Sequence, residues 1–286
     1  MPTDFFGRVM VVFNRYGMSM LQGAGVSLKI ALVGTLVGCI IGFAVGIVQT
    51  IPSERGDNPV KRAVLWAVKL ILNAYVEFFR GTPMMVQAMF IYYGSSVLFG
   101  FNMSQTFAAY FIISINTGAY MAETVRGGIL SIDPGQTEGA KAIGMNHIQT
   151  MVNVIMPQAL RNIMPQIGNN LIINIKDSSV MFIISFTEFF AAHRGAVGAT
   201  YLYFPSATIE MVGYLTMTLI ASFILHWVEK RMDGNSDYEL AKTDPLTMAA
   251  GTYSHPDRGT PFDERSKEYR DRVRQELQHG RTRGDR

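Results

Sequence analysis

The stretch DPGQTEGAKAIGMNHIQTMVNVIMP, residues 133–157, is a polar segment in a chain that is otherwise largely apolar. Asp133 can accept a hydrogen bond at a helix N-terminus, and Pro134 suits the first helical position. A short helix is therefore predicted from Pro134 to about Ile143, followed by Gly144, which can adopt the left-handed conformation that ends a helix. Asn146 can cap a second short helix, which we expect to end before the proline that closes the segment. The 133–157 segment thus predicts two short helices around a glycine turn.

The composition indicates a membrane protein. Hydrophobic residues make up 49% of the 286 residues, and they gather in runs close to the roughly 20 residues needed to span a bilayer. The net charge of +3 is too small for a nucleic-acid binder. The single cysteine, Cys39, lies inside an apolar run and excludes a disulfide framework. Arg8 and Arg15 interrupt the N-terminal apolar residues, so no removable signal peptide is predicted.

Five membrane-spanning helices are predicted. Residues 1–24 are expected to form a partly amphipathic lead-in on or near a membrane surface. Residues 60–80 are expected to form an interfacial amphipathic helix, because their charged and amide side chains share one face. The spans themselves are predicted at about residues 26–50, 84–101, 104–123, 163–190 and 207–228.

Glycines recur every four residues along the first predicted span, at Gly34, Gly38, Gly42 and Gly46. This spacing places them on one helix face. In water such glycines would weaken a helix, whereas in lipid they allow a second helix to approach closely. We interpret the stripe as a packing surface without a further function.

Basic residues are most frequent in the connections 51–82 and 124–162, which the positive-inside rule places in the cytoplasm. The N-terminus is therefore predicted outside, with the 133–157 segment and the C-terminus inside. Residues 1–232 are expected to form the transmembrane domain. Residues 233–286 carry closely balanced charges and few large apolar residues, which predicts a disordered cytoplasmic tail; a docking segment is the alternative.

No catalytic pattern is recognisable. The sequence contains no phosphate-binding loop of the GxxxxGKS or GxxxxGKT kind, no HExxH and no GxSxG. One cysteine cannot form a cysteine-pair zinc site, and His147 and His193 are isolated in sequence. The chain is therefore predicted not to be an enzyme and to have no ATPase site, metal or cofactor of its own.

The 133–157 segment resembles the EAA loop of ABC importer permeases, EAA-x3-G-x9-I-x-L-P. The residues at the corresponding positions here are Glu138, Gly139, Ala140, Gly144 and the run VIMP that ends at Pro157. The glycine that follows Glu138 departs from the pattern, as do the first and third residues of VIMP.

Further motifs resemble the polar amino acid permease family over about residues 16–232. They are FRGTPMMVQ, NTGAYMAETVRGGI, GQTEGAKAIGM and MPQALRNIMPQIGN, and KDSSV is similar to the family's KDTSL. The run MFIISFTEFF, which follows KDSSV, diverges from the family's usual small residues.

The resemblance implies an all-α integral membrane protein with the type I ABC importer permease fold and about five transmembrane helices. It implies a subunit that moves a polar or charged amino acid across the bacterial cytoplasmic membrane. The implied partners are ABC ATPase subunits, an extracytoplasmic amino-acid-binding protein, a second identical or similar permease, and lipid, with ATP and Mg on the ATPase. The residues implied in coupling to that ATPase are Glu138, Gly139, Ala140, Gly144 and Pro157.

Polar residues inside the predicted spans are candidates for a substrate path: Asn116, Tyr120, Lys176, Asp177 and Ser178. A charge at bilayer depth costs roughly 2.5–3.5 kcal/mol, so the charged pair needs partners or water. These residues could form a pocket for the charged ends of an amino acid, or they could brace the fourth span. Glu123 and Arg126, near the cytoplasmic end of the third span, are expected to act in gating or as a structural ion pair.

Two other classes of protein fit parts of the sequence. In an ion-coupled secondary amino acid transporter, Lys176 and Asp177 would be the coupling sites. A membrane-anchored helix-turn-helix regulator would use residues 133–157 to bind DNA. Membrane spans on both sides of that segment, and its few Lys and Arg residues, disfavour binding to nucleic acid.

Overall fold

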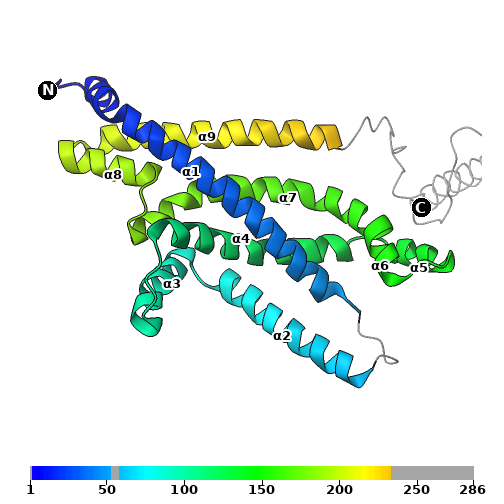
Figure 1. Cartoon of the computed structure of the whole chain (residues 1–286). Coiled ribbons are helices and arrows are strands. Elements are labelled where there is room, and N and C mark those ends of the chain that lie inside the picture. The colour runs from blue at the N-terminus through cyan, green and yellow to red at the C-terminus, as the bar shows by residue number, and fades with distance from the viewer. Residues whose placement is uncertain (1, 53–57, 233–286) are drawn as a thin grey trace, which may run out of the picture. The chain divides into compact units, whose positions relative to one another are not determined.

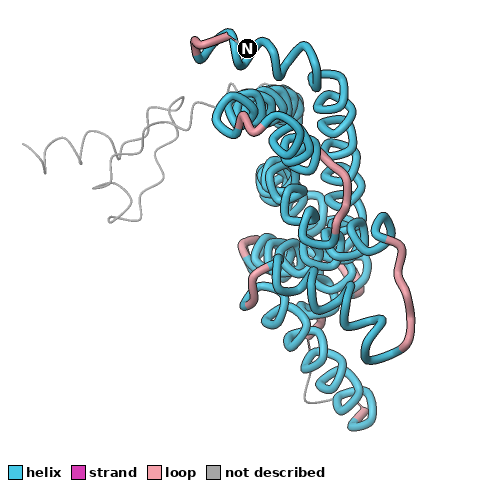
Figure 2. The backbone as a smooth tube through the Cα atoms, turned by 90° about the vertical axis from the view of Figure 1, so that its left-hand side faces the viewer, coloured by secondary structure: helices cyan, strands magenta, loops and turns pink. Residues whose placement is uncertain are grey.

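The computed structural model describes residues 2–52 and 58–232, and this part of the chain consists of helices and short loops (Figures 1 and 2). The tail predicted at residues 233–286 lies outside the described residues. The elements are α1 (Phe5–Thr50), α2 (Pro59–Gly81), α3 (Met84–Phe99), α4 (Gln105–Leu130), α5 (Pro134–Ala142), α6 (His147–Thr150), a π-helical turn (Met151–Ile155), α7 (Met156–Asp177), a 3₁₀ helix (Ser178–Ile184), α8 (Phe189–Thr200) and α9 (Tyr203–Met232).

The glycine stripe of α1 packs directly on α4. A Cβ atom added at Gly38 would lie 2.6 Å from the Cβ of Thr117, and one added at Gly46 would lie 2.8 Å from the Cβ of Val125. All four glycines of the stripe are buried. The close approach needs residues without side chains, and the interpretation of the stripe as a packing surface is confirmed.

A buried polar cluster joins α7 to this helix pair. Asn174 of α7 donates to Thr35 Oγ1 of α1 at 2.8 Å and to Thr117 Oγ1 of α4 at 3.0 Å. A polar group inside an apolar bundle is costly unless it is hydrogen-bonded, so these bonds favour one rotation of α7. They fix which face of α7 is buried and which is left open.

The lead-in predicted at residues 1–24 is continuous with the first span. Asp4 caps α1 by accepting a hydrogen bond from the Gly7 amide at 2.6 Å, and the helix then runs unbroken to Thr50. Val12 and Met20 are buried against α8 and α9. This segment is therefore packed within the bundle, which composition alone did not reveal.

The second predicted span, residues 84–101, corresponds to α3. With 16 residues α3 is about 24 Å long, which is shorter than the ~30 Å hydrocarbon core. The second half of α2 packs on α4, because Tyr75 donates to the Ile115 carbonyl at 2.6 Å and Val76 is buried. The second half of α2 therefore packs against the bundle, while most residues of α2 stay exposed.

The fourth predicted span, residues 163–190, is shorter and bent. Helix α7 ends at Asp177, a 3₁₀ helix follows, and Ser185 has a φ of 60°. Glu188 then caps α8, and its fully buried carboxylate accepts from the Ala191 amide at 2.8 Å and from Tyr214 OH of α9 at 3.1 Å.

Two described helices, α1 and α9, are long and apolar enough to cross a membrane unaided, and the bent unit of residues 147–184 and 189–200 is a third candidate. Helix α4 is not among these candidates, and it carries Asn116, Glu123 and Arg126. Polar residues at such positions have to face protein or water. The open faces of α4 and α7 are therefore the candidate functional surfaces.

Candidate coupling and translocation sites

The first half of the 133–157 segment folds as predicted. The Asp133 carboxylate accepts from the Gly135 amide at 2.7 Å, and α5 follows. Gly144 has a φ of +85°, the left-handed conformation that ends the helix. Figure 1 shows α5 and α6 beyond the adjoining ends of α4 and α7.

Side chains on α5 face in two directions. Glu138 and Gly139 are exposed, and within the described residues no hydrogen bond or ion pair engages Glu138. Ala140, by contrast, is only 5% exposed, and its carbonyl accepts from the Met145 amide at 3.1 Å. Glu138 is therefore available to a partner protein, whereas Ala140 supports the turn from inside.

The second half of the segment differs from the prediction. Asn146 caps α6 together with Gln149, as expected, but the helix does not end before Pro157. It passes through the π-helical turn into α7, and the Met156 amide bonds to the carbonyl of Met151, five residues earlier. The wider turn accommodates Pro157, which has no N–H to donate and would disturb a regular α-helix.

Two contacts attach the segment to the long helices. Gln158 of α7 donates to Gln136 of α5 at 3.2 Å, and Asn162 of α7 donates to Ser131 at the end of α4, also at 3.2 Å. Helix α5 is thus connected to α7 both along the chain and across the turn.

Helix α4 carries a row of residues on one open face, at spacings of four, three and four. We call Asn116, Tyr120, Glu123 and Gly127 the α4 row. Arg126 binds Glu123 with two nitrogens, at 2.6 and 3.3 Å. Arg80, from the last turn of α2, lies 3.8 Å from the same carboxylate.

Helix α7 carries a second row with the same kind of spacing. We call Asn162, Gln166, Asn169, Ile173 and Lys176 the α7 row. The four polar members are exposed and Ile173 is half-buried. Exposed residues on α1 and α9 are in contrast largely apolar, as at Leu36 and Phe223, which suits contact with lipid.

The two rows open on the same side of the bundle. Helices α4 and α7 are antiparallel, since Thr117 lies opposite Asn174 and Gly128 lies opposite Ile163. Successive residues of a helix are rotated by about 100° about its axis. Asn116 directly precedes the contact residue Thr117 in α4, and Ile173 directly precedes the contact residue Asn174 in α7. Each row is therefore rotated by roughly 100° from its helix's contact positions, in the same sense. For antiparallel helices, equal rotation in the same sense places both rows on one side.

The predicted path residues differ in how far their side chains are exposed. Tyr120 is 42% exposed and Lys176 is exposed, whereas Asn116 and Asp177 are half-buried. Asn116 donates to Gln87 Oε1 at 2.8 Å. Ser178 is fully buried, and its hydroxyl donates to the Ile175 carbonyl at 2.8 Å. The structure therefore does not bring Ser178 to the open face.

The structure adds residues that the sequence reasoning missed: Arg80, Gln87, Gln166 and Asn169. The polar recurrence along residues 162–176 was a detectable signal for the α7 row. Arg80 could not be assigned from spacing, because its place beside Glu123 depends on how α2 meets α4.

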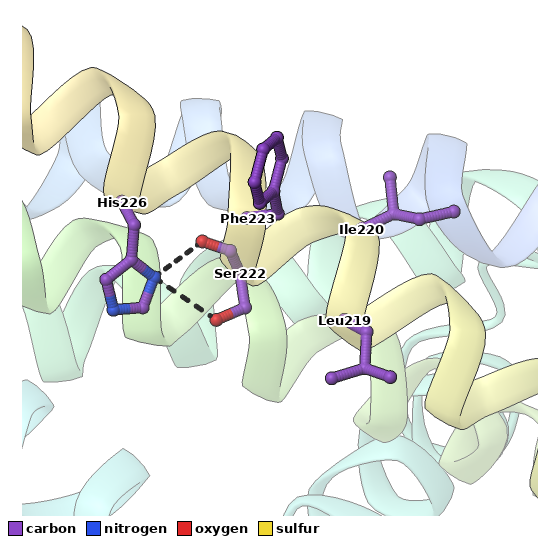
Figure 3. Close-up of a pocket in the computed structure, with 5 residues that line it drawn as sticks. All are labelled: Leu219, Ile220, Ser222, Phe223 and His226. Atoms are coloured by element: carbon purple, nitrogen blue, oxygen red, sulfur yellow. Dashed lines mark hydrogen bonds between the residues drawn. The ribbon is translucent and has the colours of Figure 1, made fainter.

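A shallow apolar depression lies on α9 (Figure 3), lined by Leu219, Ile220, Ser222, Phe223 and His226. The His226 ring bonds to the Ser222 carbonyl of its own helix at 2.7 Å. All five lining residues come from one helix, so the depression is a feature of a single helix surface and not an enclosed site.

Comparison with known proteins identifies related membrane transport proteins. Relatives include the arginine transport system permease protein of Bacillus subtilis, 33% identical over 76% of this chain and 93% of the relative. The glutamine transport system permease protein of Escherichia coli is 34% identical over 74% of this chain and 92% of the relative.

Solved structures agree in fold. The crystal structure of an amino acid ABC transporter with histidines matches with a TM-score of 0.69 and 33% identity, covering 81% of this chain and all of that one. The MetNI methionine ABC transporter, at 19% identity and a TM-score of 0.60, shows the same fold over 74% of this chain. The family model for the inner membrane component of binding-protein-dependent transport systems matches residues 62–234. The chain belongs to this family of membrane transport components, with the type I ABC importer permease fold.

Proposed function

We propose that the chain is the permease subunit of an ATP-driven importer that moves a polar or charged amino acid across the bacterial cytoplasmic membrane. The observation that carries this proposal is the exposed, capped helix α5, which presents Glu138 beyond the ends of α4 and α7 in a chain of this family. Relatives named for arginine and glutamine transport support an amino acid as the cargo.

The coupling site is α5 with its turn. An ATPase surface that grips Glu138 would displace α5 as a body, because the cap at Asp133 and the turn at Gly144 hold the helix together. The continuous helix from α6 into α7, and the bond between Gln136 and Gln158, carry that displacement into α7. The movement reaches the α7 row, where access to the path would change.

The substrate path is formed by the α4 and α7 rows. Their exposed polar side chains at bilayer depth are costly against lipid and stable against water or a polar substrate. Glu123 and Arg126 form the ion pair at the cytoplasmic part of the α4 row, in a position to open or close it. Tyr120 and Lys176 offer a polar surface further outward.

The other components follow from the same proposal. An extracytoplasmic binding protein delivers the amino acid on the side of the chain's N-terminus, and the 133–157 segment lies in the cytoplasm. A second permease closes the path across the open face. ATP and Mg are bound by the partner ATPase and not by this chain.

The proposal is tested by reversing the charge at Glu138. In proteoliposomes with ATPase and binding protein, Glu138→Lys should abolish substrate-stimulated ATP hydrolysis and leave membrane insertion intact, because the exposed side chain has no partner among the described residues. Glu229→Lys, the same reversal near the end of α9, is the matched control and should retain stimulation. Unchanged coupling in Glu138→Lys would sink the proposal.

A further inference from the structure

We infer that Arg80 binds the carboxylate group of the transported substrate. This inference rests on the proposed function and deepens it, because it gives the α4 row a defined recognition element. Arg80 lies in FRGTP, where α2 ends. It is not one of the polar residues that were noted within the predicted spans.

Arg80 is positioned at the middle of α4. The Phe79 carbonyl, one residue earlier, lies 3.4 Å from the Asn116 side-chain nitrogen, and Asn116 is near the centre of the 26-residue helix. The Arg80 side chain is 37% exposed. An exposed guanidinium beside the α4 row needs water or a polar partner on its open side.

The charges around Arg80 leave it free to bind an anion. Glu123 is already held by Arg126 through two nitrogens, at 2.6 and 3.3 Å. Arg80 approaches the same carboxylate only to 3.8 Å, beyond hydrogen-bonding distance. The two arginines and one glutamate carry a net charge of +1. Among the described residues, none accepts a hydrogen bond from the Arg80 guanidinium.

Arg80 also contacts the aromatic ring of Tyr120. Its guanidinium carbon lies 5.9 Å from the centre of the Tyr120 ring, which is close enough for a cation–π contact. The planar guanidinium presents paired donors that match the two oxygens of a carboxylate. The geometry therefore suits a carboxylate that enters from the open side of the α4 row.

A purely structural role does not account for this position. Arg126 already neutralises Glu123. The carbonyls at the end of α2 are a second possible target for a basic side chain, but Gln87 donates to the Phe79 and Thr82 carbonyls at 2.9 Å each. Both structural tasks are thus performed by other residues.

The ligand class is an amino acid with a free α-carboxylate. Every amino acid carries this group, so Arg80 would recognise the class of substrate and leave discrimination between side chains to other residues. A substrate whose carboxylate is converted to a neutral amide would lose the charge-assisted bond.

The test measures how strongly binding depends on the carboxylate. The full-length chain, purified with its ATPase and partner permease but without binding protein, is screened with the common amino acids by thermal shift. Binding of the best amino acid is then compared with that of its α-amide by competition with radiolabel. The variants are Arg80→Gln and Arg80→Lys, and Arg161→Gln serves as a control at another exposed arginine.

The wild-type complex and Arg161→Gln should prefer the acid over the amide by about tenfold or more, as expected for a bond between charged groups. Arg80→Gln should bring this ratio close to one, and Arg80→Lys should give an intermediate value. An unchanged ratio in Arg80→Gln, or equal loss of acid and amide binding, overturns the role of Arg80. A wild-type complex that binds no amino acid would instead overturn the proposed function.

Discussion

Single side chains determine which parts of the bundle face one another and which face the path. Asn174 and Ile173 are neighbours in α7, yet Asn174 is buried in a three-helix polar cluster and Ile173 belongs to the open α7 row. On α1, Thr35 joins the same cluster, while its neighbour Leu36 is 58% exposed. Ile173 and Leu36 are therefore apolar residues at a similar height in the bundle, and we expect Ile173 to face the proposed path and Leu36 to face lipid.

This difference can be measured by cysteine labelling. With the single native cysteine replaced by Cys39→Ser, Ile173→Cys should react with a water-soluble thiol reagent, because water on the path permits thiolate formation. Leu36→Cys should stay largely unlabelled, since lipid disfavours the thiolate. Equal labelling of the two positions in intact membranes would contradict the assignment of the path.

At the scale of elements, two of the three glycines in the 133–157 segment, Gly139 and Gly144, are predicted to have opposite tolerance to alanine. A Cβ added at either position meets nothing within 4 Å, so space does not distinguish them. Gly144 has a φ of +85°, where alanine costs roughly 1–2 kcal/mol, whereas Gly139 lies in α5, where alanine is favoured by about 1 kcal/mol.

Gly144→Ala should therefore lower the fraction of ATP hydrolysis that is coupled to uptake, because the turn that aims α5 is strained. Gly139→Ala should retain coupling. The ratio of substrate uptake to ATP hydrolysis in proteoliposomes gives the readout. A Gly144→Ala variant with the normal ratio would show that the turn does not set coupling.

Elements were predictable where local signals decide them. Asp133 and Asn146 act as caps, Gly144 ends α5, and the glycine stripe lies on a buried face, all as expected. Prediction failed at Pro157, which appeared to end a helix. A local π-helical turn, in which the Met156 amide bonds to the Met151 carbonyl, carries the chain past it.

The contact between the end of α2 and α4 could not be predicted either. The charges of residues 60–80 predict an amphipathic helix, but the hydrogen bond from Tyr75 to the Ile115 carbonyl depends on the fold. Much of the candidate site was visible in the sequence as polar residues within apolar runs, including Tyr120 and Lys176. Ser178, which was predicted among the path residues, is fully buried, and Arg80 was missed, because exposure and the approach of α2 to α4 are properties of the folded bundle.

At the scale of the whole molecule, the chain combines a proposed path and a proposed coupling helix with no recognisable ATP site in its sequence. An importer of this kind has to draw its energy from a second protein bound at α5. An ion-coupled transporter would instead draw energy from a gradient through charges such as Lys176.

Uptake into proteoliposomes distinguishes these two sources of energy most directly. The permease is reconstituted with its ATPase and binding protein, the proton and sodium gradients are collapsed with ionophores, and radiolabelled amino acid is supplied on the binding-protein side. We expect uptake when ATP is present on the ATPase side and none when ATP is omitted. Uptake that persists without ATP and disappears when the gradients are collapsed would contradict the account.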